Sequence, residues 1–181
     1  ELAEELARKE REAQAMNELE EAKRIALQQE KIKACTEELN RLADEVDGFA
    51  KERDAKILQL DEFYATELTS EEQLPELKLK HAGFHTDLEQ LANILKTHKK
   101  DYENIAFEYS SLDNEELNIL REGIKNKLYD LKNLLGQAEQ KLDDFILNAK
   151  DTLENLSLSQ KSEEDQGKRE EFLRAQLGNA L

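Results

Sequence analysis

Two histidines of this sequence have a spacing that is compatible with a metal-binding site. His81 and His85 are four positions apart, and on an α-helix this spacing places both imidazoles where they could bind a metal ion with a third ligand. However, His81 falls on a line of apolar residues and His85 does not. We therefore expect one packed histidine and one exposed histidine, and we predict no metal site.

Three further features contain residue types that occur in redox, calcium-binding or catalytic sites, but they lack the spacing that such sites require. Cys35 is the single cysteine, which excludes an intramolecular disulfide; we interpret it as a small core residue or an interface residue. The acidic run from Asp44 to Gly48 lacks the ligand spacing of a calcium loop. His98, which falls on the apolar line of the second helix, is interpreted as a helix-end histidine with a solvated edge. Because neither a Gly-rich phosphate loop nor a nucleophile elbow is present, we expect no enzyme and no cofactor.

Composition predicts long helices. The 181 residues are 38% charged and include one proline and six glycines, which is typical of helical proteins with few turns. The formal charge of −16, from 26 basic and 42 acidic residues, disfavours nucleic acid and anionic lipid as partners. No apolar run approaches the ~20 residues that span a bilayer. We expect a cytoplasmic protein, and a piece of a longer one, since both ends lie within helical pattern.

Turn signals divide the chain into three helices. The first runs without proline to about residue 66, and Ser70 with Gln73 then forms a predicted capping box ahead of Pro75. The second ends near residue 109, and Asp113 with Glu116 forms the next predicted capping box. The third runs to about residue 156. Beyond it the apolar pattern is lost over residues 157–167, and a short last helix follows.

Apolar residues in all three helices recur at alternating steps of three and four, which is the spacing of a heptad stripe. Short connections make neighbouring helices antiparallel, so the three stripes should meet in an up-down-up bundle. We therefore predict an all-α fold. The predicted core residues are Leu39, Leu42, Val46, Phe49, His81, Phe84, Leu88, Leu91, Leu95, Leu128, Leu131 and Leu135.

The predicted helix lengths do not match. The first helix covers about 65 residues and the second about 35, so some 30 to 35 residues of the first extend beyond the bundle and carry apolar residues. Covering these residues with a second chain is worth several kcal/mol, which favours a homodimer. The alternatives are packing on a neighbouring domain, or fraying. The predicted dimer residues are Leu6, Met16, Leu19, Ile25 and Ile32.

Three strings resemble the spectrin repeat. Residues 42–52 are similar to the family's "aDELexWixEK", with Phe49 in place of the tryptophan, and residues 80–88 (KHAGFHTDL) match its "KHxxFxxDL". Residues 124–131 resemble its third-helix "WxxL" region. This resemblance implies a spectrin-like three-helix repeat at 39–156, a helical neck at 1–38 as in α-actinin-like proteins, and a linker or short helix at 157–181. It also implies a cytoskeletal spacer in an antiparallel homodimer, with actin bound by flanking domains.

Two other interpretations remain open. An adaptor module that binds a partner helix in a groove would be monomeric and would expose an apolar patch. A plain parallel coiled coil is disfavoured by Pro75 and the two capping boxes, which break the heptads at bundle-length intervals. The lysines of the second and third helices either pair with glutamates of their own helix or dock on acidic segments of a second copy.

Overall fold

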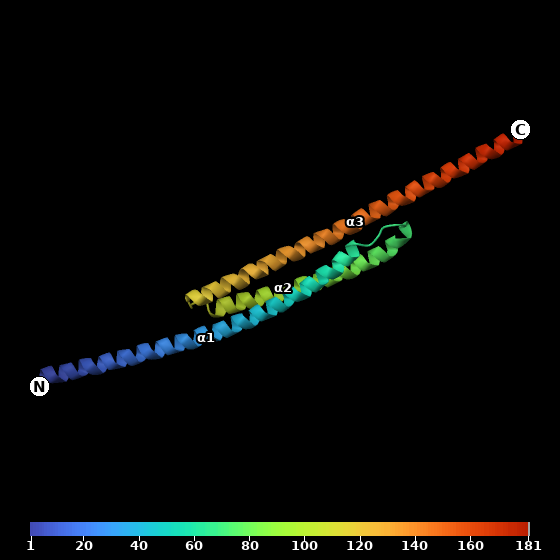
Figure 1. The fold of residues 1–181 in the computed structure, drawn as a ribbon. Coiled ribbons are helices and arrows are strands. Elements are labelled where there is room, and N and C mark those ends of the chain that lie inside the picture. The colour runs from blue at the N-terminus through green and yellow to red at the C-terminus, as the bar shows by residue number, and fades with distance from the viewer. Residues whose placement is uncertain (181) are drawn as a thin grey trace. The chain divides into compact units, whose positions relative to one another are not determined.

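The computed structural model describes the backbone of residues 1–180 and the side chains of residues 1–178. Three long helices and one short 3-10 helix follow one another: α1 (Leu2–Tyr64), η1 (Glu71–Gln73), α2 (Leu74–Glu108) and α3 (Glu115–Ala180). Figure 1 follows the chain from α1, which begins in blue, through α2 in green to α3, which ends in red. The predicted all-helical three-helix bundle is confirmed, and residues 1–180 include no strand.

The chain divides into two compact units, each with a part of all three helices. Unit 1 comprises residues 1–49 and 95–130, and unit 2 comprises residues 50–94 and the described part of 131–181. Each unit has its own buried core of leucines and other apolar side chains.

In unit 1, α2 runs antiparallel to α1, and α3 runs parallel to it. The hydroxyl of Tyr109, the residue directly after α2, interacts with Glu38 on α1, and His98 on α2 contacts Glu45 further along α1. On α3, Lys127 forms an ion pair with Asp47. The buried apolar residues of unit 1 are Cys35, Leu39, Leu42, Val46, Phe49, Leu95, Leu112, Leu117, Ile124 and Leu128.

In unit 2, an aromatic cluster joins the three helices. The ring of Phe63 on α1 lies 5.2 Å from that of Phe84 on α2 and 4.8 Å from that of Phe145 on α3, between centroids. An ion pair of 2.9 Å between Lys56 and Asp87 adds a second α1–α2 contact and shows their antiparallel direction. The buried apolar residues of unit 2 are Leu60, Phe63, Leu77, Leu88, Leu91, Leu131, Leu135, Ala138, Leu142, Ala149 and Leu153.

Two of the twelve predicted core residues lie at the edge of the core. His81 and Phe84 are only partly buried, whereas the other ten are buried. His81 extends to the surface, where its Nε2 lies 3.0 Å from Asp143 Oδ1. An imidazole keeps a polar partner in this position, which the middle of an apolar core does not offer.

The turn between α1 and α2 has the predicted capping box. The Ser70 hydroxyl accepts a hydrogen bond from a backbone N–H of the first turn, and the Gln73 side chain accepts one from the Ser70 backbone. Gln73 also donates to the Glu67 carbonyl at 2.9 Å, which joins the turn to the residues after α1. Pro75 lies within the first turn of α2, where its missing N–H leaves no hydrogen bond unmade.

The prediction that Asp113 caps the third helix is wrong by one residue. Asn114 is the capping residue, and its Oδ1 accepts a hydrogen bond of 3.1 Å from the Leu117 N–H. Asp113 instead accepts one from the Asn118 amide. Asparagine and aspartate cap helices about equally well, so the sequence alone does not distinguish the two neighbours.

The predicted interruption of the last helix is absent. Residues 157–167 are helical, and α3 continues as one helix to Ala180. Six of these eleven residues are Leu, Gln, Lys or Glu, which are strong helix formers, so helical propensity continues where the apolar pattern does not. Within residues 1–180, no helix has a stretch long and apolar enough to cross a membrane.

Candidate association surface

The first half of α1 is exposed. In residues 1–31 every side chain is exposed except that of Ala7, which is half-buried. We call these residues the amino-terminal segment. Of the five predicted dimer residues, Leu6 (57% exposed), Met16 (64%), Leu19 (57%) and Ile25 (44%) lie in it, and Ile32 is partly buried at its end. At about 1.5 Å per residue, the segment offers a helical surface roughly 45 Å long.

The buried residues of α1 lie on one heptad line, the bundle line, which consists of Cys35, Leu39, Leu42, Val46, Phe49, Leu60 and Phe63. Counted backwards in steps of seven from Cys35, this line reaches Gln28 and Glu21, which are polar. Of the predicted dimer residues, Ile25 and Ile32 belong to it, since they precede Leu39 by fourteen and seven positions. Within the amino-terminal segment the bundle line therefore keeps one large apolar residue, Ile25, among mostly polar ones.

A second heptad line passes through the segment. Leu2 and Leu6 begin it, and steps of three and four lead on to the next members. Its apolar members other than Ala13 are 54–78% exposed. We call it the pairing line, and it consists of Leu2, Leu6, Lys9, Ala13, Met16, Glu20, Lys23 and Leu27.

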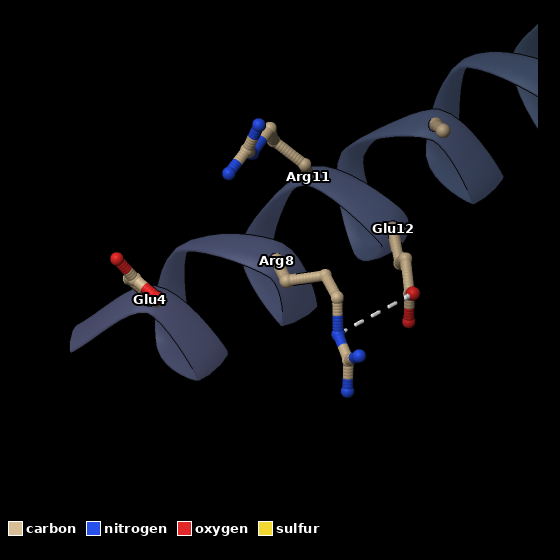
Figure 2. A pocket seen from close by; sticks show the side chains of 5 residues that line it. Glu4, Arg8, Arg11 and Glu12 are labelled. Carbon is tan, nitrogen blue, oxygen red and sulfur yellow. Dashed lines mark ion pairs between the residues drawn. The ribbon is translucent and has the colours of Figure 1, made fainter. Parts of the chain in front are cut away.

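Charged side chains flank the pairing line and interact within their own helix. Figure 2 shows Arg8 extending toward Glu12, with Arg8 Nε 4.0 Å from Glu12 Oε1, while Arg11 leaves another side of the helix. Both members of this pair are about two thirds exposed, so the pair contributes little to stability. The segment carries six basic and nine acidic residues. This nearly balanced charge permits close approach of a second copy, which a uniformly acidic segment would oppose.

The carboxyl-terminal part of α3 exposes apolar side chains that the sequence analysis did not assign to any surface. Side chains from Leu158 to residue 178 are all exposed, including those of Phe172 (62%), Leu173 (51%) and Leu177 (66%). A signal for a continuous helix was present in the sequence. Leu173 and Leu177 follow Phe145 and Ala149 by 28 positions, which is four heptads.

The histidine pair and the cysteine singled out from the sequence make packing contacts and an ion pair. His81 pairs with Asp143 in unit 2, and its ring stacks on that of exposed His85, with centroids 6.2 Å apart. Cys35 is fully buried, and burial raises the pKa of its thiol, which the nearby guanidinium of Arg121 partly opposes. A buried thiol with a raised pKa is a poor nucleophile.

The run from Asp44 to Gly48, whose composition is similar to that of a calcium loop, is helical throughout within α1. A helix holds successive side chains about 100° apart, so it cannot wrap these carboxylates around one ion as a calcium loop does. Asp44 is exposed, and Asp47 pairs with Lys127.

Comparison with known protein families, with curated proteins and with solved structures finds no match to this chain.

Proposed function

We propose that this chain is a structural element that pairs with a second copy of itself through the amino-terminal segment of α1. The observation that supports this proposal is the exposed pairing line on a helix of 63 residues, of which α2, at 35 residues, accompanies only a part. Isolated helices are marginal in water and take most of their stability from packing of an apolar side. A second copy supplies that packing.

The energetic gain is sufficient for a reversible dimer. Leu2, Leu6, Met16 and Leu27 of each copy would leave water, and each is worth about 1.5–3 kcal/mol when fully buried. Association itself costs roughly 4–15 kcal/mol, and Lys9, Glu20 and Lys23 interrupt the apolar surface. We expect a dissociation constant on the order of micromolar.

The charges on the pairing line favour antiparallel pairing. In a parallel dimer in register, each residue lies opposite its own copy, so Lys9, Glu20 and Lys23 each meet a like charge. In an antiparallel dimer whose facing residue numbers sum to 29, Lys9 lies opposite Glu20, Leu2 opposite Leu27 and Ala13 opposite Met16. Opposite charges at facing positions stabilise the pairing, and like charges suppress the other orientation.

Disulfide trapping tests both the pairing and its direction. In a Cys35→Ala background, Leu2→Cys chains and Leu27→Cys chains carrying different tags are mixed and oxidised. Antiparallel pairing predicts cross-linked dimers that contain one chain of each kind. Chains linked only to their own kind would show parallel pairing, and a lack of cross-links at micromolar concentration would contradict pairing through this segment. Leu79→Cys, on an exposed position of α2, is the matched control for random collision.

The more specific form of this proposal is the rod of an α-actinin-like actin cross-linker of the cytoskeleton, with a spectrin-like repeat at residues 39–156. The strings at residues 42–52, 80–88 and 124–131 support it. In this form the dimer sets the distance between two actin-binding domains outside residues 1–181. The chain itself should then stay in the supernatant when actin filaments are sedimented, and co-sedimentation would contradict this form.

A helical adaptor that binds a partner helix is the second candidate. It is favoured by the exposed ring of Phe107 on α2, which is 84% exposed and lies in unit 1 with Ile119, which is 68% exposed. The two candidates differ in mass, because the adaptor is monomeric at concentrations at which the pairing line predicts a dimer.

A further inference from the structure

Three side chains of unit 1 bring metal-binding atoms together away from the association surface. Glu45 projects from α1, and His98 and Asp101 project from α2. One ligand atom of each lies within 4.8 Å of the other two, and His98 Nδ1 is 3.7 Å from Glu45 Oε2. His98 and Asp101 are three positions apart, so they are neighbours on one side of α2.

The imidazole of His98 is held in place with one ring nitrogen unsatisfied. Its side chain is only 14% exposed, and the ring packs edge-on against that of Phe49 at 6.1 Å between centroids. Nδ1 is buried and has no hydrogen-bond partner among the described residues. Buried polar atoms nearly always make a hydrogen bond in native proteins. A buried imidazole nitrogen that makes none, although one carboxylate oxygen lies 3.7 Å away, points to a ligand that His98 shares with the two carboxylates.

From this geometry we propose that Glu45, His98 and Asp101 bind a divalent transition-metal ion of the Zn²⁺ or Co²⁺ type. One imidazole nitrogen with two carboxylate oxygens is a donor set that these ions accept, whereas Ca²⁺ requires six to eight oxygens. Metal–ligand bonds of about 2.0–2.2 Å require the three atoms to move closer together than they now lie. Glu45 is 49% exposed, so its side chain is free to make this movement.

The surroundings supply the negative charge and an open coordination position. A shallow groove of about 270 Å³ beside the cluster is lined by Glu38, Glu45, Asp101 and Glu108 together with a single cation, Arg41. This excess of carboxylates raises the local concentration of cations. Since the groove opens to solvent, water completes the coordination. A bound ion would link α1 to α2 within unit 1.

Calorimetric titration of the full chain with Zn²⁺, after removal of metals by a chelator, tests the proposal. One ion should bind per chain, and a saturating excess should raise the midpoint of thermal unfolding by several degrees, because the ion binds the folded state preferentially. Co²⁺ should give the visible absorption bands of a low-symmetry site. Asp101→Asn and His98→Gln should each lower the affinity for Zn²⁺ at least tenfold. His85→Gln, which removes one member of the His81–His85 pair, should leave the affinity within twofold of that of the original chain.

Each other outcome overturns the proposal. Loss of binding in His85→Gln with retention in His98→Gln would assign the ion to the histidine pair on α2. Several weakly bound ions, unaffected by any variant, would show unspecific attraction to an acidic surface, and no saturation by about 1 mM Zn²⁺ would exclude a site. Asp101→Asn preserves the shape of its side chain, so it keeps the test decisive if His98→Gln perturbs the fold, which metal-free circular dichroism would reveal.

Discussion

A single arginine joins the ends of two helices in unit 1. Nη2 of Arg121, on α3, donates to the Tyr109 carbonyl at 2.9 Å, and Nη1 donates to the Leu112 carbonyl at 3.0 Å. Both carbonyls lie in the turn that follows α2, and the Tyr109 carbonyl also accepts a hydrogen bond from the Leu112 N–H. The guanidinium fork binds both carbonyls at once, and its charge strengthens both bonds.

We predict that Arg121→Ala lowers the free energy of unfolding by about 2–3 kcal/mol, because it leaves two part-buried carbonyls without a charged donor. Arg121→Lys should recover only part of this loss, since an ammonium group does not reproduce the planar fork. Urea unfolding followed by circular dichroism measures both values. Equal stability of the lysine variant and the original chain would show that charge alone matters here.

Burial also makes the chain sensitive to alkaline pH. It raises the pKa of the Cys35 thiol above its ordinary value of 9.0 and the pKa values of Tyr64 and Tyr102 above 10.0. The unfolded chain therefore releases these protons at lower pH than the folded chain does. Where the unfolded chain binds fewer protons, stability falls as pH rises.

We accordingly predict that the midpoint of thermal unfolding is insensitive to these groups below about pH 9 and falls between about pH 9 and 11. Cys35→Ala should remove the earliest part of the decline and Tyr64→Phe a later part, each judged against its own value at pH 7. The Tyr64 hydroxyl has no hydrogen-bond partner within the described residues, so its removal breaks no hydrogen bond there. A midpoint that stays constant up to pH 11 would contradict this assignment.

At the scale of the elements, the start of α3 offers a direct comparison of two neighbouring residues. Asn114 caps the helix, and Asp113 makes an exposed bond to the Asn118 side chain. We predict that Asn114→Ala lowers the free energy of unfolding by about 1 kcal/mol. Asp113→Ala should lower the free energy of unfolding by less than half as much. Thermal unfolding of the two variants measures the difference, and the reverse order would restore Asp113 as the cap.

The helices could be predicted from the sequence because their signals are local. Heptad spacing indicated three helices, and Ser70, Gln73 and Pro75 marked the first turn. After Arg53 the three-and-four spacing also fits Ile57, Leu60 and Tyr64, but Leu60 and Phe63 are the residues buried there. Arg53 and Lys56 occupy two positions of the bundle line between Phe49 and Leu60. Their aliphatic chains pack against the bundle while Arg53 forms an ion pair with Asp54 and Lys56 forms one with Asp87.

Side-chain groupings between helices were not predictable in the same way. His81 with Asp143, and Glu45 with His98, join residues 62 and 53 positions apart in the sequence. Separations of this length do not follow the repeat of a helix, so the sequence gives no signal that these residues are neighbours. Only the packing of the helices brings them together, which is why sequence reasoning considered the histidine pair on one helix and missed the cluster formed by two.

At the scale of the whole molecule, composition was enough to predict long helices. The surface through which a second copy would pair was harder to predict, because apolar spacing alone does not separate the pairing line from the bundle line. The five residues predicted for the dimer lie on different heptad lines. Leu6 and Met16 belong to the pairing line, whereas Ile25 belongs to the bundle line. Met16 and Ile25 were both predicted for the dimer, but only Met16 lies on the pairing line, so substitutions at these two positions should differ in their effect on pairing.

The most direct test is the mass of the chain in solution, by sedimentation equilibrium across micromolar concentrations. For the original sequence we predict a mass that rises with concentration from near the chain mass of 20.9 kDa toward twice that value. For Met16→Glu, which places a carboxylate on the pairing line, we predict the single chain mass throughout. Ile25→Glu, a matched control on the same exposed segment, should remain dimeric. A monomeric original chain, or a Met16→Glu variant that dimerises as well as the original does, would contradict pairing through this helix.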